Sequence, residues 1–276
     1  DAVIDDVVSE YNGLGYSGTN SGGNLTIVNS TFRYNRAGIV PNSGSYELCY
    51  PGRETTIVGN VVYSNNQPDT PAIDVALLAM GNGILPAGGT GNDIERNLVF
   101  DHDRTGIGLV PFPEEDASDV PPPPEEDTRP CADTVNDAPA DPADIPDLVI
   151  WEPRGNTVIG NVVEDSRLAD LALGSVGDAS TLGNCFSGNT YATTAPLELE
   201  ALAPCEGSGS GGDWSAGALD LITLMTAVQP PSGDYKTTPV PGPQPSMPDA
   251  ATAPPRPATD APASVDVAAI QVPARP

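Results

Sequence analysis

One short pattern recurs along the chain and constrains its fold more than any other feature. It is clearest as TTIVGNVVYSNN (residues 55–66) and NTVIGNVVEDS (residues 156–166), where Gly-Asn lies between two β-branched pairs and a polar turn follows. Aligning the first β-branched pair places five positions in one register: Ile27, Ile57, Ile94, Val158 and Phe186. Their spacings are 30, 37, 64 and 28 residues (27 to 57, 57 to 94, 94 to 158, 158 to 186), and the 64 becomes 27 without a 37-residue Pro-rich insertion (residues 111–147). A period in the high twenties indicates stacked repeats.

Polar residues recur at the corners of the repeat unit. The same corner position is taken by four asparagines, and only Ser30 departs from the pattern: Asn60, Asn97, Asn161 and Asn189. At a second corner, Tyr34-Asn35 takes the place of Tyr11-Asn12, and Asp101-His102 follows at the comparable turn. Each unit holds two or three short β-rich pieces between Gly, Asn, Asp or Ser, with no helix-length apolar period.

This pattern resembles the right-handed parallel β-helix repeat proteins of the pectate-lyase-like solenoid superfamily, over roughly residues 1–194. The resemblance implies that each coil adds short strands to parallel sheets and that the corner asparagines stack inside turns. We therefore expect an all-β fold: a right-handed parallel β-helix solenoid with loop insertions, a short helical C-terminal cap and a Pro-rich tail. This fold hosts both enzymes and non-catalytic surface proteins, so it defines no activity.

Composition divides the chain into three parts. We expect a parallel β-helix over 1–194 with an acidic Pro-rich loop at 111–147, a helical cap with a Gly/Ser linker over 195–228, and an extended Pro-rich tail over 229–276. Because the chain begins inside a repeat-like stretch, we expect upstream coils or a removed leader to precede Asp1, to cover the strand edges at that end.

Three segments have ambiguous patterns. The apolar run AIDVALLAMGNGILPAGG (residues 72–89) is interrupted by several glycines, which favours strands over a helix. Asp213 is placed to cap a helix that runs through Val228. The segment SVDVAAIQVP (residues 264–273) is β-prone and is suited to joining an exposed sheet edge, in this molecule or another.

Charge and cysteine content limit the partners and the compartment. The chain has 38 acidic and 11 basic residues, a formal net charge of -27, so we expect no nucleic-acid partner. No stretch is apolar enough for a membrane span. Proximity favours pairing Cys49 with Cys131 and Cys185 with Cys205, one of three possible connectivities. Paired cysteines imply an oxidising location, and hence a secreted or cell-surface protein.

Two groups of residues are candidates for function. If the protein is an enzyme, the best catalytic candidates are the consecutive Asp101, His102, Asp103 and Arg104, which supply a base, an orienting acid and a cation. The alternative is a solvated turn, because neighbours in an extended segment alternate faces. If the protein binds polysaccharide, Tyr11, Tyr34 and Tyr63 lie in or near turns where aromatic rings can meet sugars.

Lyases of the resembled family use a cluster of acidic calcium ligands on one sheet face, with Arg or Lys as the base. The corresponding positions here do not form such a cluster: Arg33, Tyr63, Phe100 and Glu164. With one histidine and no CxxC, the usual zinc site is also not expected. We expect no metal site or cofactor, with calcium left open.

These observations predict a non-catalytic scaffold or binding protein outside the cytoplasm, with polysaccharide or a neighbouring chain contacted through the tail as partner. The alternatives are a carbohydrate-active enzyme, lyase or hydrolase-like, and a structural subunit of an extracellular assembly.

Overall fold

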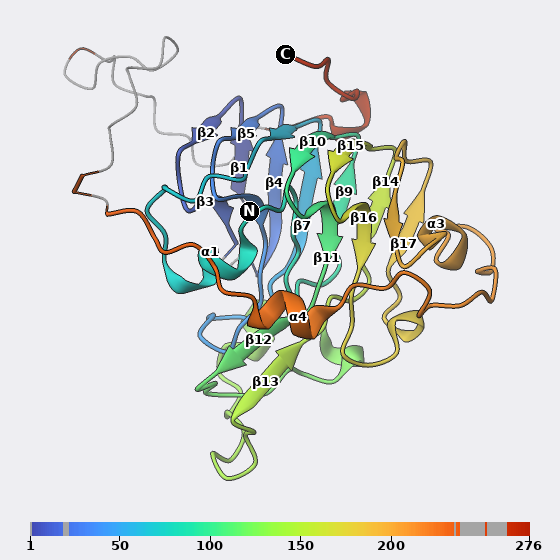
Figure 1. Cartoon of the computed structure of the whole chain (residues 1–276). Helices are drawn as coiled ribbons and strands as arrows, with labels where there is room; N and C mark the ends of the chain where they lie inside the picture. Colours follow the sequence, from blue (N-terminus) through green and yellow to red (C-terminus); the bar gives the residue numbers. More distant parts are fainter. Residues whose placement is uncertain (1, 19–21, 235, 238–251, 253–263) are drawn as a thin grey trace.

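Short parallel strands from successive repeats lie side by side in rows (Figure 1). The computed structural model describes residues 2–18, 22–234, 236–237, 252 and 264–276. The first sheet has six strands: β1 (Ala2–Asp5), β4 (Gly22–Val28), β7 (Arg53–Val58), β9 (Asp93–Glu95), β14 (Thr157–Ile159) and β17 (Cys185–Ser187). Its central register contains the five positions aligned from the sequence, all fully buried: Ile27, Ile57, Ile94, Val158 and Phe186. The repeat alignment is therefore confirmed.

Two further rows follow the first sheet along most of the repeats. The second sheet contains β2 (Val8–Glu10), β5 (Thr31–Arg33), β8 (Val61–Tyr63), β10 (Leu98–His102) and β15 (Val162–Ser166). The third row contains β3 (Leu14–Ser17), β6 (Ala37–Val40), β11 (Thr105–Leu109), β16 (Ala169–Leu173) and β18 (Thr194–Ala195), with Ile84 bridging β6 and β11. One apolar cluster includes buried side chains from all three rows, so the rows share a single core.

Stacked asparagines join the layers at three corners. One set is Asn92, Asn156 and Asn184; we call the other two sets the first and second Asn rows. The first Asn row is Asn60, Asn97, Asn161 and Asn189. Within it, each Oδ1 accepts the backbone N–H and side-chain Nδ2 of the preceding member, at 2.9–3.0 Å. The second Asn row is Asn12, Asn35 and Asn65, bonded in the same way at 2.9–3.2 Å. The corner positions expected from the sequence are thus stacked, and their buried amides are hydrogen-bonded.

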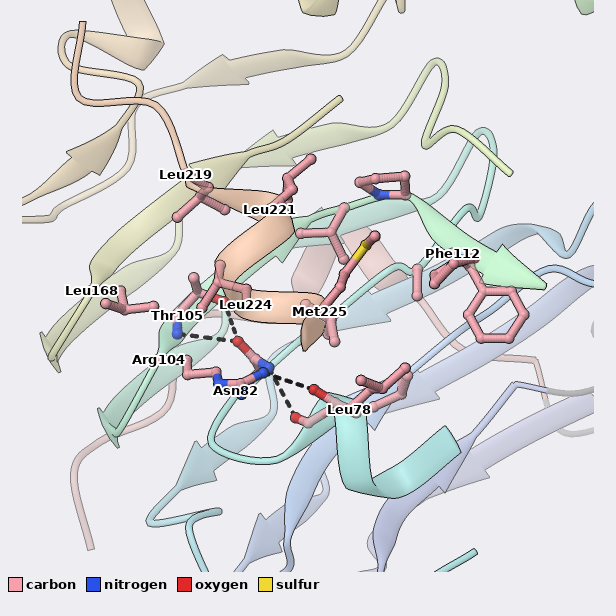
Figure 2. Close-up of a pocket in the computed structure, with 17 residues that line it drawn as sticks. Leu78, Asn82, Arg104, Thr105, Phe112, Leu168, Leu219, Leu221, Leu224 and Met225 are labelled. Carbon is pink, nitrogen blue, oxygen red and sulfur yellow. Dashed lines mark hydrogen bonds between the residues drawn. The ribbon is translucent and has the colours of Figure 1, made fainter. Parts of the chain in front are cut away.

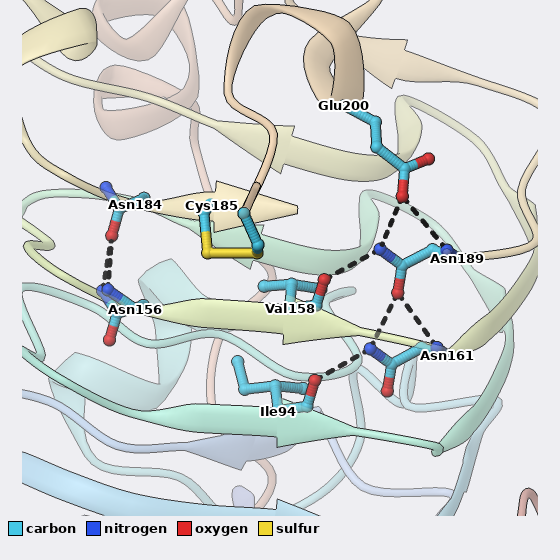
Figure 3. Close-up of a disulfide and its surroundings, with 9 residues drawn as sticks. Ile94, Asn156, Val158, Asn161, Asn184, Cys185, Asn189 and Glu200 are labelled. Carbon is cyan, nitrogen blue, oxygen red and sulfur yellow. Dashed lines mark hydrogen bonds between the residues drawn. A yellow bond between two sulfur atoms is a disulfide. The ribbon is translucent and has the colours of Figure 1, made fainter. Parts of the chain in front are cut away.

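A short helix ends the first Asn row. The Oε1 atom of Glu200 in α3 (Leu199–Leu202) accepts from Asn189 N and Nδ2 at 3.2 and 3.4 Å, in the place where another asparagine would lie (Figure 3). The disulfide between Cys185 and Cys205 lies beside it and ties the last strand of the first sheet to the segment after α3. Both pairings proposed from the sequence are present, since Cys49 is joined to Cys131.

The expected fold class, an all-β right-handed parallel β-helix, is wrong for this chain. The described residues form a mixed structure: parallel sheets, one antiparallel pair, and short helices between and beyond the strands. The antiparallel pair is β12 (Phe112–Glu115) with β13 (Leu148–Trp151). The helical elements are α1 (Asp74–Ala79), η1 (Pro124–Glu126), α2 (Cys131–Thr134), η2 (Ala179–Thr181), α3, α4 (Leu221–Thr226) and η3 (Val267–Ala269).

Two local expectations failed for identifiable reasons. The run 72–89 was expected to be strands, yet α1 forms at its start because DVALLA contains good helix formers and ends before Gly81. Asp213 does not cap a long helix. It accepts from Ser215 N in a turn, and Asp220 caps the shorter α4 by accepting from Thr223 N.

The insertion 111–147 is held to the repeats through the Cys49–Cys131 disulfide and at its base. Trp151 of β13 is 1% exposed, and its Nε1 donates to Glu114 of β12 at 2.7 Å. The Glu114 carboxylate also accepts from the backbone N and Oγ of Ser45, so the insertion is fastened to the repeats at its base. Most of the Pro-rich tail, residues 238–251 and 253–263, lies outside the described residues. None of the helices in the described part of the chain has the length and apolar character needed to span a bilayer.

Candidate binding surface

Four aromatic rings form a continuous row along one edge of the second sheet. The ring centroids of Tyr11 and Tyr34 are 5.8 Å apart with a 28° interplanar angle, and those of Tyr34 and Tyr63 are 5.5 Å apart, edge to face. Tyr63 stacks on Phe100 at 4.8 Å and 6°. Exposure falls along the row, from 45% for Tyr11 to 8% for Tyr63. The three tyrosines singled out from the sequence are therefore brought together. We call these four side chains the aromatic row.

Charged groups lie beside the exposed end of the aromatic row. Arg33 Nε donates to Glu10 Oε2 at 2.8 Å, and its Nη1 donates to the Tyr63 hydroxyl at 3.0 Å. The hydrogen bond to Tyr63 raises the pKa of Arg33, and a hydrogen bond with the same hydroxyl raises the pKa of Tyr34. Both groups therefore keep their protons at neutral pH. The exposed end of the row presents the Tyr11 ring beside a guanidinium and a carboxylate, which suits a ligand with both C–H faces and hydroxyls.

His102 does not face this surface or any other. It is 2% exposed and takes the place of an asparagine at the end of the second Asn row, with its Nε2 3.3 Å from Asn65 Nδ2. Asn65 Nδ2 can only donate, so Nε2 is the acceptor and the proton lies on Nδ1. Burial lowers the pKa of His102 to about 3. A neutral, enclosed imidazole of this kind is a structural group without access to a substrate.

The other three members of the proposed catalytic cluster point to different places. Asp101 is exposed at a positive φ of 60° and accepts from Ser64 Oγ at 2.5 Å. Asp103 is exposed, and its backbone N donates to Asn66 Oδ1. Arg104 donates to the Leu78 carbonyl at 2.8 Å and to Gln229 Oε1 at 3.1 Å. The structure therefore does not bring Asp101, His102, Asp103 and Arg104 around one point.

The residues present do not fit a calcium site of the kind used by the resembled lyases. Within the described ranges, no three His, Cys, Asp or Glu side chains are grouped as metal ligands. The sheet position where the family carries acidic ligands holds Glu10, Arg33, Tyr63, Phe100 and Glu164 in register. Its two carboxylates lie on the two end strands of the sheet, and Glu10 is paired with Arg33.

A polar groove of about 500 Å³ lies between the turns before the first sheet and the insertion. Arg53 Nη1 donates to the Asp127 carbonyl at 2.8 Å, and Arg154 lies 3.4 Å from the Asp127 carboxylate. Burial raises the pKa of Asp127, although Arg154 opposes this. The groove charges are thus largely paired with one another, and its described lining has no aromatic ring.

A second cavity is apolar and small. It has a volume of about 80 Å³ and lies under α4, between Leu221, Leu224 and Met225 on one side and Leu78 and Phe112 on the other (Figure 2). Ligand pockets are usually several times larger. This cavity is therefore a packing gap beneath α4, a helix with no fully buried residue, in which Ile222 is 74% exposed.

Sequence reasoning missed the arginines that hold the structure together. Arg53 and Arg154 line the polar groove, and Arg96 binds the C-terminal segment described below. One signal was available: a chain with only 11 basic residues against 38 acidic ones seldom places a guanidinium without a specific partner. The partners themselves are far away in sequence and could not be named.

Comparisons of the chain with protein-family models, with curated proteins and with solved structures find no match. The resemblance to the pectate-lyase-like superfamily therefore stays a prediction.

Proposed function

We propose that the protein is a secreted or cell-surface binding protein that holds extracellular polysaccharide on the aromatic row, without catalysis. The observation that supports this best is the alignment of Tyr11, Tyr34 and Tyr63, with the outermost ring nearly half exposed. The exposed Tyr11 ring at the end of this row offers a sugar a stacking position beside Glu10 and Arg33.

Two further observations support the proposal. Both disulfides indicate an oxidising environment, as expected outside the cytoplasm. The candidate catalytic residues are dispersed, and His102 is enclosed, so a hydrolase or lyase centred on residues 101–104 lacks a shared reaction site. A separate observation bears on the structural-subunit alternative: the C-terminal segment, residues 264–276, is bound to the repeats through Arg96.

The test measures binding and turnover together. The protein is incubated with immobilised acidic and neutral polysaccharides, with and without calcium, and both retention and new reducing or unsaturated ends are scored. We expect retention without new ends, and about tenfold weaker retention for Tyr11→Ala, because losing one stacked ring removes roughly 1–1.5 kcal/mol. Tyr46→Ala is the matched control, since Tyr46 is 50% exposed in the loop after β6 and lies outside the aromatic row.

Three results would change the assignment. Equal retention by Tyr11→Ala and Tyr46→Ala would remove the aromatic row as the binding surface. New chain ends that disappear in Asp103→Ala would replace the binding function with an enzyme. Neither retention nor new ends on any polysaccharide would leave the structural subunit.

A further inference from the structure

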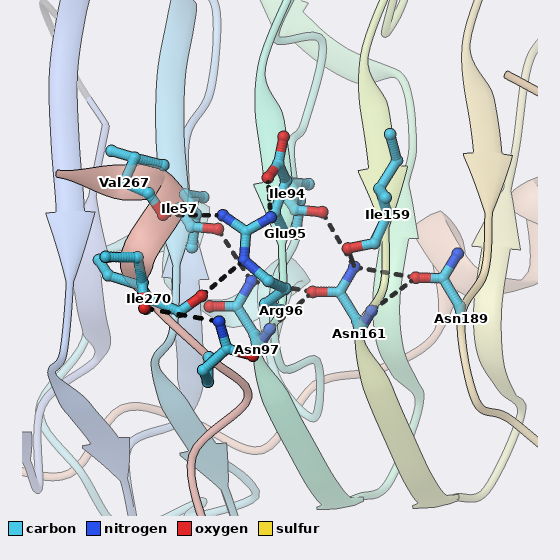
Figure 4. A network of polar contacts seen from close by, with 12 residues as sticks. Ile57, Ile94, Glu95, Arg96, Asn97, Ile159, Asn161, Asn189, Val267 and Ile270 are labelled. Atoms are coloured by element: carbon cyan, nitrogen blue, oxygen red, sulfur yellow. Dashed lines mark hydrogen bonds and ion pairs between the residues drawn. The ribbon is translucent and has the colours of Figure 1, made fainter.

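The C-terminal segment, residues 264–276, lies against the outer side of the repeats. Arg96, at the turn between the first and second sheets, donates from Nε to the Ile270 carbonyl at 2.8 Å and from Nη2 to the Val267 carbonyl at 2.9 Å (Figure 4). A third guanidinium nitrogen is fixed by Glu95 at 2.6 Å. Arg96 therefore binds the main chain of this segment, in an orientation set by its own neighbour.

The segment continues over the second sheet and covers apolar side chains there. Val272 packs against a cluster formed by Tyr63, Leu98 and Phe100, all less than 9% exposed. The guanidinium carbon of Arg275 lies 4.1 Å from the centre of the Phe100 ring, and its nitrogens are 3.1 Å from Glu164 and 3.5 Å from Asp165. One hydrophobic contact and one charge match thus reinforce the main-chain contacts. We call the surface that the segment contacts the segment site. It consists of Gly59, Tyr63, Arg96, Leu98, Phe100, Glu164 and Asp165.

The segment can dock here because Gly59 has no side chain. A Cβ at Gly59 would lie 2.2 Å from Ile270 Cγ2, far inside contact distance. Gly59 has a φ of 66°, and Asn29 occupies the same turn one layer earlier with a φ of 48°. Asparagine is thus tolerated by this turn, while glycine at position 59 leaves room for Ile270.

We propose that the segment site is a peptide-binding surface that also accepts segment 264–276 of a second copy of this chain, so that copies are joined by exchanged C-terminal segments. Residues 238–263 separate the segment from Thr237, and a stretch of 26 residues spans up to about 90 Å when extended, enough to reach a neighbour. A tethered segment has an effective concentration in the millimolar range, so its own site is favoured in dilute solution. Exchange between copies therefore requires a high protein concentration, or a chain whose own segment site is blocked.

The first experiment uses the full chain and a labelled synthetic peptide of residues 264–276. Val272→Asp weakens docking of the chain's own segment by placing a carboxylate in the apolar cluster near Glu164, and so opens the site. Fluorescence polarisation should show saturable peptide binding to Val272→Asp, and at least tenfold weaker binding to the wild-type chain. Adding Gly59→Asn to Val272→Asp should weaken binding at least tenfold.

The matched control is Gly188→Asn in the same Val272→Asp background. Gly188 has a φ of 63° in the same row of turns, and no described atom lies within 4 Å of its Cβ position, so binding should not change. Arg96→Asn is a second test of the site that keeps a residue suited to the positive φ of 49°, and should weaken binding about tenfold. Absence of peptide binding to Val272→Asp, or equal binding with and without both site substitutions, would overturn the proposal.

The second experiment tests exchange between copies. The Gly59→Asn chain has a blocked site and an intact segment, whereas the Val272→Asp chain has an open site and a weakened segment. Each alone should sediment as a monomer, and their mixture should form a heterodimer at concentrations above the peptide Kd. If the peptide binds but the mixture stays monomeric, exchange between copies is wrong. No saccharide is present in either experiment, so failure here leaves the proposed polysaccharide binding untouched.

Discussion

The first and second Asn rows both hydrogen-bond the amides of successive layers, at adjacent corners. Of these two rows, the first contains asparagine alone, whereas the second continues into a histidine. In the first Asn row every buried amide bonds to the next, and the row finishes on Glu200. In the second, the position after Asn65 is taken by His102, whose Nδ1 has no hydrogen-bond partner among the described residues. Ser166 Oγ, in the next layer, is also buried without one.

This difference shows how a structural substitution can resemble a catalytic residue. An imidazole accepts a hydrogen bond at Nε2 as an amide oxygen does, so His102 continues the row by one step. Its Nδ1–H has no partner among the described residues of the next layer, where Ser166 stands opposite His102, so the row stops there. The only histidine in the chain is therefore explained by the repeat, without invoking catalysis.

The largest effect should come from breaking the first Asn row at its centre. Asn161 is 0% exposed; its Oδ1 accepts from Asn97 N and Nδ2, and its Nδ2 donates to Asn189 Oδ1 and the Ile94 carbonyl. Asn161→Ala leaves these buried groups unpaired, and we expect the free energy of unfolding to fall by about 3–5 kcal/mol in urea titrations. Asn12→Ala, at the exposed end of the second row, should cost less than ~1 kcal/mol. Equal losses would show that burial of the rows is unimportant.

The repeats could be predicted from the sequence because their signals are local. A β-branched pair, Gly-Asn and a second pair recur in order, and the structure places Ile27, Ile57 and Ile94 in register as aligned. The stacked asparagines and the tyrosines followed from the same alignment. Register in a parallel row is set by such repeated positions, so errors were few where the repeat is regular.

One failed prediction has a local cause: segment 72–89 was expected to be strands because of its glycines, but helix formers precede them and α1 forms. The other features that could not be predicted depend on contacts between distant residues. The insertion was ordered by Glu114 bonding to Ser45, which no local pattern marks. The directions of Asp101 and Arg104 could not be predicted because adjacency in sequence does not set direction: Asp101 bonds to Ser64, and Arg104 bonds to Gln229. The position of the C-terminal segment depends on Arg96, which is 174 residues from Ile270 in the sequence.

A smaller effect, on the pH dependence of the unfolding free energy, should come from His102→Asn, which makes the second Asn row like the first. The folded pKa of His102, about 3, is below its ordinary value of about 6.5. Between these values the unfolded chain binds a proton that the folded chain excludes, so stability falls as pH decreases. From pH 7 to 5 the wild-type unfolding free energy should drop by about 2 kcal/mol more than that of His102→Asn, which retains every carboxylate. An identical pH dependence would place the imidazole in contact with water.

The smallest effect should come from the end of the first Asn row, where Glu200 replaces a further asparagine. Its Oε1 accepts two bonds from Asn189, which is only partly buried, so water can take over part of this role. Glu200→Ala should therefore lower the free energy of unfolding by about 1 kcal/mol, and Glu200→Gln, which keeps the accepting oxygen, by close to zero. Thermal and urea unfolding of both variants measure this. A large loss in Glu200→Gln would mean that the negative charge, rather than the acceptor, ends the row, and the two Asn rows would then differ in electrostatics as well as in composition.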